Sequence, residues 1–340
     1  MSSSYQMPAE WAPHERCWMA WPLSERTFGA QLDAARNEYA AVAQAIAEFE
    51  PVTMLYDPDN CAGVRELAQV ANITLMECPL NDSWLRDTGP TFVLDANGTL
   101  AGVDWAFDGW GTDWPTEKDA GIAKHVITLS GVQYVQSSMI FEGGALNIDD
   151  HATIVTTRQC FEHRTRNGGP TMSEVEAELS NRLGVSKVIW LNETLENDST
   201  NGHVDVVAAF APNGTVLCQV SSDLDDPDYD NLQANLKILK SETDAAGKPM
   251  NVVELISPPV SRHSDGSRRM LSYANFYVAN GGVIVPQYGF PDADARAMKT
   301  IADVFPDHKV IGVMTNAIAD GGGNIHCITQ QQPKTGSHHA

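Results

Sequence analysis

Basic residues and long hydrophobic runs are what this sequence lacks most. Only 22 of its 340 residues are Lys or Arg, against 44 Asp and Glu, so the formal net charge is −22. Nucleic acids and anionic membranes are bound through clustered Lys and Arg, and no stretch of about 18 apolar residues could cross a membrane. The first residues also lack the basic and hydrophobic segments of an export signal. We therefore expect no nucleic-acid or membrane partner and a cytoplasmic location.

Closely spaced cysteines are missing as well. None of the six stands in the C-x-x-C spacing typical of structural zinc sites and redox motifs, and disulfide frameworks belong to short, cysteine-rich secreted chains. The sequence therefore predicts reduced thiols, most of them ordinary core residues. They are Cys17, Cys61, Cys78, Cys160, Cys218 and Cys327.

Linkers and low-complexity tracts are absent too. The length alone would allow two domains, but no spacer divides the chain. Apolar residues make up 43% of it, enough to bury a core. We expect one domain over residues 1–332 and a flexible tail over residues 333–340.

Short apolar runs alternate with segments of helical periodicity, which predicts an α/β protein. Asn97-Gly98 and Asn213-Gly214, each between apolar runs, predict β-hairpins, so we do not expect purely parallel sheets. Ser173 and Glu176 match a capping box at the start of a helix. The expected helices span Gln31–Phe49, Ser173–Leu183, Tyr229–Lys240 and Ala293–Val304. The expected strands are Val52–Tyr56, Thr91–Leu94, Thr153–Thr157, Lys187–Leu191, Val206–Phe210, Val216–Val220, Asn275–Ala279, Val283–Pro286 and Lys309–Val313.

Four segments carry polar residues where a purely structural interpretation expects apolar or turn residues. The first, Asn81–Pro90, precedes an expected strand and holds Trp84 and Asp87. Such a segment is often only a turn. An aromatic face beside a carboxylate can also hold a planar or alkyl-bearing cation, so Trp84 and Asp87 are candidates for ligand binding.

The second and third segments place a carboxylate beside glycines and a histidine near an aspartate. In Phe141–Gly144, two glycines would let the backbone approach a ligand next to Glu142, although Gly-Gly is common in turns. In Thr200–Asp205, an extended backbone would point His203 and Asp205 to the same side. That pair could move protons and bind a substrate. The alternative is a solvent-exposed edge strand.

The fourth segment, Asp320–Thr329, has three consecutive glycines before His326 and Cys327. Such a run implies unusual dihedral angles or a close approach, which makes Cys327 the best nucleophile candidate among the cysteines. His326 is expected to face away from it, because neighbours in an extended strand point to opposite sides. A metal held by His203, Asp205 and His326 is not favoured, since no close ligand spacing supports it. No serine elbow, phosphate-binding loop or dinucleotide fingerprint occurs.

These four segments, in this order, resemble the agmatine deiminase family of the guanidino-group-modifying (pentein) superfamily. The resemblance runs nearly end to end, through MPAEWAPHERCWMAWP, FEPVTMLY, NDSWLRDTGPTFV, DWAFDGWG, SMIFEGGALNID, STNGHVD, SYANFYVANGGVIVPQYG and GGGNIHCITQQQP. It implies a five-bladed, pseudo-symmetric α/β propeller around a central site, a cysteine nucleophile, and no cofactor or metal.

The resemblance also implies a role for each main candidate. Cys327 would attack a guanidinium carbon, Asp87 and Asp205 would grip guanidinium nitrogens, and His203 would protonate the departing ammonia and then activate water. Carboxylates can hold a planar guanidinium in two-pronged geometry, and the bound cation would favour the thiolate. Agmatine would be hydrolysed to N-carbamoylputrescine and ammonia through a covalent S-alkylthiouronium.

The pocket itself is less fully implied. Glu142 resembles the family's additional acidic substrate contact and Trp84 a wall of its pocket. Ser199, next to Asp198, stands where the family usually has an acidic residue four positions before its histidine, and Asn147 stands where a histidine is common. If these positions shape the pocket around the distal amine, another small guanidine or a peptidyl-arginine becomes an alternative substrate. A non-catalytic guanidine-binding protein is the remaining alternative.

A cationic substrate gives the net charge of −22 a second meaning. The field of an acidic protein can steer a cation toward its site, with an effect that salt weakens. A surface suited to solubility or to a salty habitat is the other explanation. The sequence leaves a homo-oligomer open.

Overall fold

One three-strand pattern recurs through the protein. The computed structural model describes residues 5–112, 114–162 and 169–335, which form five separate sheets and a mixed α/β fold. In each sheet an antiparallel pair of strands is followed by a helix, which returns the chain to a strand parallel to the second. A helical crossover is what a parallel neighbour requires, whereas an antiparallel neighbour needs only a short turn.

The strands form the five sheets in the following groups. The sheets contain β1 (Tyr5–Gln6), β5 (Thr91–Asp95), β6 (Leu100–Ala106) and β7 (Gln133–Ile140); β8 (Asn147–Ile148), β9 (Thr153–Thr157) and β10 (Lys187–Leu191); β11 (Ala208–Ala211), β12 (Thr215–Val220) and β13 (Asn251–Ile256); β14 (Tyr277–Ala279), β15 (Gly282–Gln287) and β16 (Lys309–Met314); and β17 (Thr329–Pro333), β2 (His14–Ala20), β3 (Val52–Tyr56) and β4 (Ile73–Glu77).

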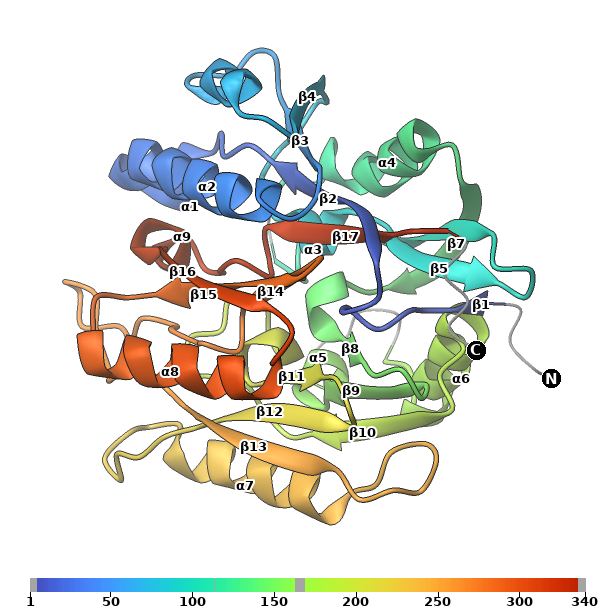
Figure 1. Cartoon of the computed structure of the whole chain (residues 1–340), viewed down its shortest axis with the longest axis vertical. Helices are drawn as coiled ribbons and strands as arrows, with labels where there is room; N and C mark the ends of the chain where they lie inside the picture. The colour runs from blue at the N-terminus through green and yellow to red at the C-terminus, as the bar shows by residue number, and fades with distance from the viewer. Residues whose placement is uncertain (1–4, 113, 163–168, 336–340) are drawn as a thin grey trace.

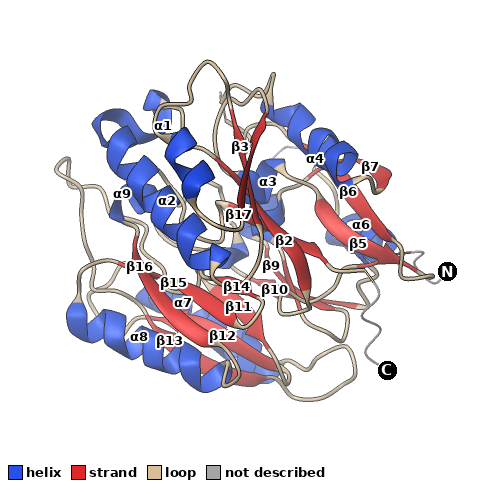
Figure 2. Cartoon of the chain, turned by 45° about the horizontal axis from the view of Figure 1, so that its top comes forward, coloured by secondary structure: helices blue, strands red, loops and turns tan. Residues whose placement is uncertain are grey.

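The connecting helices lie outside the strands. In Figure 1, α2, α4, α7 and α8 flank the strands on the periphery, and Figure 2 shows the same for α2, α4 and α8. The five crossover helices are α4 (Ile122–Ser130), α6 (Met172–Leu183), α7 (Tyr229–Ser241), α8 (Pro291–Val304) and α2 (Leu32–Ala47). Short helices are α1 (Glu25–Phe28), α3 (Leu85–Thr88), α5 (Gln159–Glu162) and α9 (Asn316–Asp320).

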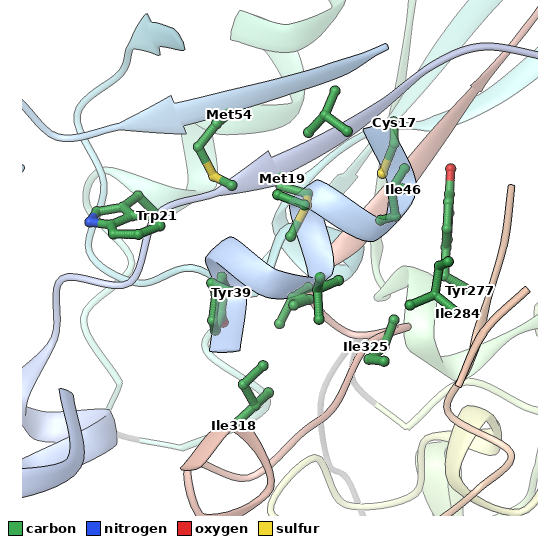
Figure 3. Packing of buried hydrophobic residues seen from close by; sticks show 14 of the residues in the cluster. Cys17, Met19, Trp21, Tyr39, Ile46, Met54, Tyr277, Ile284, Ile318 and Ile325 are labelled. Carbon is green, nitrogen blue, oxygen red and sulfur yellow. The ribbon is translucent and has the colours of Figure 1, made fainter. Parts of the chain in front are cut away.

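The α2 helix shows how a crossover helix is held against its sheet. Its buried residues include Ala35, Tyr39, Val42 and Ile46, which recur at helical spacing and form one apolar stripe. Figure 3 shows Tyr39 and Ile46 beside Met19 and Met54 of the sheet. Burial of one such large side chain contributes about 1.5–3 kcal/mol, so this stripe fixes the helix on its sheet.

Most predicted elements are confirmed to within a few residues. The hairpins at Asn97-Gly98 and Asn213-Gly214 join antiparallel pairs, β5 with β6 and β11 with β12. The capping box was misplaced, because Thr171 and Glu174 form it, two residues before the predicted pair. The elements that were not predicted are β1, β2, β4, β6, β7, β8, β13, β17, α1, α3, α4, α5 and α9.

Two strand starts were also wrong, and both errors touch the candidate site. The strand expected from Val206 begins at Ala208, after a 3₁₀ turn over Val204–Val206. The strand expected from Asn275 begins at Tyr277. In both places a polar residue just before the strand, Asp205 or Asn275, forms a hydrogen bond with His326 instead of joining the sheet.

The last strand joins residues from opposite ends of the chain. β17 pairs antiparallel with β2, with Thr329 opposite Met19 and Pro333 opposite His14. Pro333 therefore belongs to a sheet, although the flexible tail was expected to start there. Residues 336–340 of that expected tail lie outside the described residues. No helix within the described ranges is long and apolar enough to cross a membrane.

Candidate active site

Each sheet supplies one polar segment directly before the first strand of its hairpin. Asp87 precedes β5, Glu142 precedes β8, Asp205 precedes β11, Asn275 precedes β14 and Cys327 precedes β17. The strands β8, β11, β14 and β17 lie toward the middle of the molecule in Figure 1. Four of these segments were predicted from the sequence. Asn275 was missed, although an amide at the edge of an apolar run was a signal for it.

Cys327 is buried in a turn and held by the side chain of Asn275. Asn275 Nδ2 lies 3.3 Å from Cys327 Sγ, and its Oδ1 accepts from the backbone N–H of His326 at 3.0 Å. The thiol also lies 3.4 Å from Asp205 Oδ2. Burial, and then the nearby charges of Asp205 and Asp87, raise the pKa of Cys327 well above its ordinary value. The thiol is therefore protonated in the unliganded protein.

The three glycines before His326 are explained by geometry. Gly322 has φ +106°, a conformation that side-chain-bearing residues rarely adopt. A Cβ on Gly323 would lie 2.5 Å from the ring of Trp84 and 3.0 Å from Cys327 Cβ. The turn can thus pass close enough to Trp84 to place the thiol beside it.

Asp87, His203 and Asp205 surround one point next to Gly144. A Cβ at Gly144 would lie 2.5 Å from His203 Nδ1, 3.0 Å from Asp87 Oδ1 and 3.1 Å from Asp205 Oδ2. Only glycine leaves this point free. The three predicted residues are therefore brought together around one space.

Asp87 is fixed by two donors. Trp110 Nε1 donates to its Oδ2 and the Gly144 N–H donates to its Oδ1, at 2.9 and 3.0 Å. Burial raises its pKa, and the charges of Glu142 and Asp205 add to that effect, although His203 opposes it. Trp110 was not predicted as a site residue.

His203 is a fully buried histidine with one bonded and one open nitrogen. Nε2 lies 3.3 Å from Glu142 Oε2, whereas Nδ1 has no hydrogen-bond partner among the described residues and lies 3.7 Å from Asp87 Oδ1. Burial alone would lower its pKa, but the carboxylates of Asp87 and Glu142 outweigh burial and raise the pKa to about 9. His203 is therefore an imidazolium at neutral pH and can give up a proton.

Asp205 does not orient His203 in the way that the extended-strand prediction required. The 3₁₀ turn replaces the extended backbone, and Asp205 Oδ2 instead accepts from His326 Nδ1 at 2.9 Å. Burial raises the pKa of Asp205, but the hydrogen bond and charge of His326, together with the charge of His203 and the Cys327 thiol, outweigh burial, so the pKa is lowered. The prediction that His326 faces away was also wrong, because His326 and Cys327 lie in a turn rather than a strand.

Two further buried charged residues, Glu10 and Arg86, lie next to His326 and were not predicted from the sequence. Glu10 Oε1 lies 2.9 Å from His326 Nε2 and 3.7 Å from Arg86 Nη1. Burial raises the pKa of Glu10, but His326 and then Arg86 overcome burial and bring it to about 2. An acidic residue in the motif MPAEW and a basic one beside Asp87 were visible signals, but their pairing depends on the tertiary fold.

A cavity of about 290 Å³ opens onto Cys327 and Asp87. Trp84, Trp110 and Trp114 form apolar walls, so Trp84 lies where it was predicted. Glu142, His203 and Asp205 do not line the cavity; they lie buried behind Cys327 and Asp87. The arrangement suits a small planar cation, which the carboxylates would bind beside a nucleophile and an acid.

The two positions that depart from the family pattern lie in different places. Ser199 lines the cavity, and its hydroxyl donates to the Gly322 carbonyl at 3.4 Å. Asn147 is not among the lining residues, and its side chain donates to Glu10 and accepts from the Phe210 N–H. Of these two residues, Ser199 is the one that borders the cavity. No group of three or more His, Cys, Asp or Glu side chains in the described ranges could hold a metal ion.

Comparisons with known proteins agree with this geometry. A family model described as Porphyromonas-type peptidyl-arginine deiminase matches residues 6–333. The chain is similar to the agmatine deiminase of Stutzerimonas stutzeri (39% identity over 97% of this chain and 95% of the relative) and to that of Ectopseudomonas mendocina (38% over 98% and 96%). It also resembles the solved agmatine deiminase of Enterococcus faecalis, with a TM-score of 0.91 and 33% identity over 97% of this chain and 96% of the other.

Proposed function

The chain belongs to the Porphyromonas-type peptidyl-arginine deiminase family, and on that premise we propose that it hydrolyses agmatine to N-carbamoylputrescine and ammonia. The single observation that carries the proposal is the spatial one. Cys327, Asp87 and Asp205 lie within one buried cluster beside His203, whose pKa is raised to about 9. A thiol, two carboxylates and a protonated histidine are what deimination of a guanidinium needs.

Substrate binding prepares the nucleophile. Asp87 and Asp205 hold the nitrogens of the guanidinium, and Glu142 lies behind His203. The thiol of Cys327 is protonated until a cation arrives, because burial and two carboxylates raise its pKa. A bound guanidinium offsets those carboxylate charges, so the thiol loses its proton to water and becomes a thiolate only in the complex.

The first half of the reaction forms a covalent intermediate. The Cys327 thiolate attacks the guanidinium carbon, forming a C–S bond and a neutral tetrahedral adduct. The imidazolium of His203 gives its proton to one nitrogen, the C–N bond breaks, and ammonia leaves. The product of this step is an S-alkylthiouronium cation beside a neutral His203.

The second half releases the ureido product. Neutral His203 takes a proton from water, and the hydroxide so formed adds to the thiouronium carbon. Collapse of this adduct breaks the C–S bond, returns the electron pair to sulfur, and leaves the protonated urea, whose proton ammonia accepts. His203 ends as an imidazolium and Cys327 as a thiolate, as they stood before the attack.

The cavity volume favours a small substrate over a peptide. About 290 Å³ lies at the lower end of the range for small-molecule sites, about 300–1,000 Å³. The family description names peptidyl-arginine, which makes a peptide the second candidate. Three tryptophans along the cavity support a slim alkyl chain between the guanidinium and its distal end.

The test compares guanidines with the purified protein. We expect release of ammonia and formation of ureido product from agmatine well above the rates with arginine, guanidino acids and a peptidyl-arginine. Comparable or greater activity on those substrates would overturn agmatine as the substrate. A Cys327→Ala variant should lose turnover by about 10⁴-fold or more and still bind agmatine.

Intact-mass measurement after acid quench tests the covalent step. Wild type should gain the mass of the substrate less ammonia, and Cys327→Ala should not. Cys218→Ala is the matched control, because Cys218 is another fully buried thiol in β12. An adduct that persists in Cys327→Ala or disappears in Cys218→Ala contradicts the assignment.

The proposal also covers the architecture of the protein, its domain organisation and its location. The five recurring units are the blades of a five-bladed propeller, supported by their shared order of strands and helix. They make up one catalytic domain, supported by the pairing of β17 with β2. The reaction takes place in the cytoplasm, supported by cysteines that form no disulfide in the described part of the chain, as expected in a reducing compartment.

A further inference from the structure

A chain of four buried charged side chains extends from Asp205 away from the cavity. His326 lies between two carboxylates, with Nδ1 2.9 Å from Asp205 Oδ2 and Nε2 2.9 Å from Glu10 Oε1. Arg86 follows Glu10, with Nη1 at 3.7 Å. All four residues are at least nine-tenths buried, and none of Glu10, His326 and Arg86 lines the cavity. The mechanism above makes no use of Glu10, His326 or Arg86.

The geometry determines the protonation state of His326. An ionised carboxylate can only accept hydrogen bonds, so an imidazole bonded to two of them must donate from both nitrogens. Burial and the nearby Arg86 lower the pKa of His326, but Glu10 and Asp205 outweigh them and raise it. The charges therefore alternate along the chain, negative at Asp205, positive at His326, negative at Glu10 and positive at Arg86.

Asp205 needs such support because it shares its surroundings with other acids. Asp87 and Glu142 lie in the same buried cluster, and repulsion between close carboxylates favours protonation of one of them. The pKa of Asp87 is raised, whereas that of Asp205 is lowered. The largest contributions that lower the pKa of Asp205 are the hydrogen bond and the charge of His326, and Asp87 has neither.

The same hydrogen bond orients Asp205. Oδ2 is occupied by His326 and by the Cys327 thiol, whereas Oδ1 is buried without a hydrogen-bond partner among the described residues. Buried polar atoms are normally bonded, so an open carboxylate oxygen next to the nucleophile marks a place for a ligand donor. His326 also immediately precedes Cys327 in the same turn, and Arg86 Nε donates to the His326 carbonyl at 3.2 Å.

We propose that Glu10 and His326 are positioning residues, which keep Asp205 ionised and direct its free oxygen at the guanidinium beside Cys327. Glu10 acts through His326, and His326 acts through Asp205. The inference rests on the proposed function, because it assumes that a guanidinium or similar planar cation binds at Asp205.

The test measures how well the site distinguishes a planar cation from a neutral molecule. Cys327 is alkylated with 2-chloroacetamidine, a planar amidinium, and separately with iodoacetamide, which is neutral and of similar size. Wild type should react faster with the amidinium. In Glu10→Gln and His326→Gln this preference should fall by about 10-fold or more, while the iodoacetamide rate stays near that of wild type, because access to the thiol is unchanged.

Steady-state kinetics give a second readout. His326→Gln should lower kcat/KM for agmatine by about 10²-fold, the effect of a misplaced binding group, with KM rising as the carboxylate loses its hold. The double variant Glu10→Gln/His326→Gln should be little worse than His326→Gln alone, since the proposal has Glu10 act through His326. Additive losses in the double variant would contradict that order.

Glu50→Gln is the matched control. Glu50 is another buried carboxylate that binds a histidine, His14, and it does not line the cavity. It should leave the amidinium preference and KM unchanged, which separates positioning from loss of stability. If His326→Gln does not fold, the isosteric Glu10→Gln still decides the question, with thermal unfolding as the check on folding.

Failures of the two proposals look different. If the wild type turns over no guanidine, the proposed function is wrong. The alkylation comparison still tests the positioning role in that case. If the wild type is active and the Glu10→Gln and His326→Gln variants keep its amidinium preference and its KM, the positioning role is wrong.

Discussion

Two buried pairs of histidine and glutamate differ in how completely their polar atoms are bonded. His14 Nδ1 lies 3.1 Å from Glu50, and His14 Nε2 lies 2.9 Å from the Glu10 carbonyl. Glu50 also accepts from the Tyr277 hydroxyl at 2.7 Å and from the Asn280 N–H at 2.8 Å. Each polar atom of this pair has a partner within the protein.

His203 and Glu142 form the contrasting pair. His203 Nε2 lies 3.3 Å from Glu142, but its Nδ1 has no partner in the described part of the chain, although the side chain is fully buried. Buried polar groups are bonded in nearly all cases. The fully bonded pair, His14 and Glu50 (the closed pair), connects β2, the segment after α2 and β14. In the pair of His203 and Glu142 (the open pair), Nδ1 of His203 is left for a molecule that is not part of the protein.

Removing the open histidine should have the largest effect on activity. His203→Asn takes away the proposed proton donor, and general acid–base catalysis contributes about 10²–10⁴-fold, so kcat should fall by that factor with agmatine. The kcat is measured on protein that thermal unfolding shows to be folded at the assay temperature. A His203→Asn variant with near-wild-type kcat would break the distinction between the two pairs.

The pH dependence of stability should also distinguish the two histidine–glutamate pairs. The pKa of His203 is raised from 6.5 to about 9 in the fold, so its protonated form stabilises the protein fully below pH 6.5. That stabilisation is lost as the pH rises through 9, by about 3 kcal/mol in all. The difference in unfolding free energy between wild type and His203→Asn should therefore vary between pH 6.5 and 9. A difference that is constant across this window would disprove the raised pKa.

Closing the open space should mimic loss of the histidine. A Cβ in Gly144→Ala would lie 2.5 Å from His203 Nδ1, so the imidazole must move, and kcat/KM should fall by about 10²-fold. Gly121→Ala is the control, since a Cβ there meets nothing within 4 Å. Equal activities of the two variants would show that the space beside Nδ1 is not used.

Weakening the closed pair should affect stability alone. Glu50→Gln replaces an acceptor of three hydrogen bonds and should lower the free energy of unfolding by about 1–3 kcal/mol, with kcat of the folded protein unchanged. Chemical denaturation and agmatine kinetics on the same preparation measure both quantities. Loss of kcat without loss of stability would reverse the roles of the pairs.

Sequence reasoning predicted the elements whose cause is local and missed those whose cause is tertiary. The periodicity of α2 and the turn at Asn213-Gly214 follow from neighbouring residues, and both are confirmed. β2 was missed because its first residues bind partners far along the chain, such as Asn280 at His14.

The same division holds within the candidate site. Cys327, Asp87 and His203 stand in polar motifs and were predicted, and the structure brings them together. Glu10 reaches His326 across 316 positions in sequence, so no spacing could indicate the pair. The orientation of His326 was mispredicted because the turn before β17 depends on Asn275, which precedes β14 of another sheet.

The pairing of β17 with β2 has a consequence for how the protein is made. The ribosome synthesises β2 among the first strands and β17 after all the other described strands, so one edge of β2 stays unpaired until the end of translation. Exposed strand edges are prone to pairing with other chains. Cys327 stands two residues before β17 and is set in place by the same late event. We therefore expect one edge of β2 to stay open to other chains until the last sheet closes, and the Cys327 thiol to reach its place in the site only then.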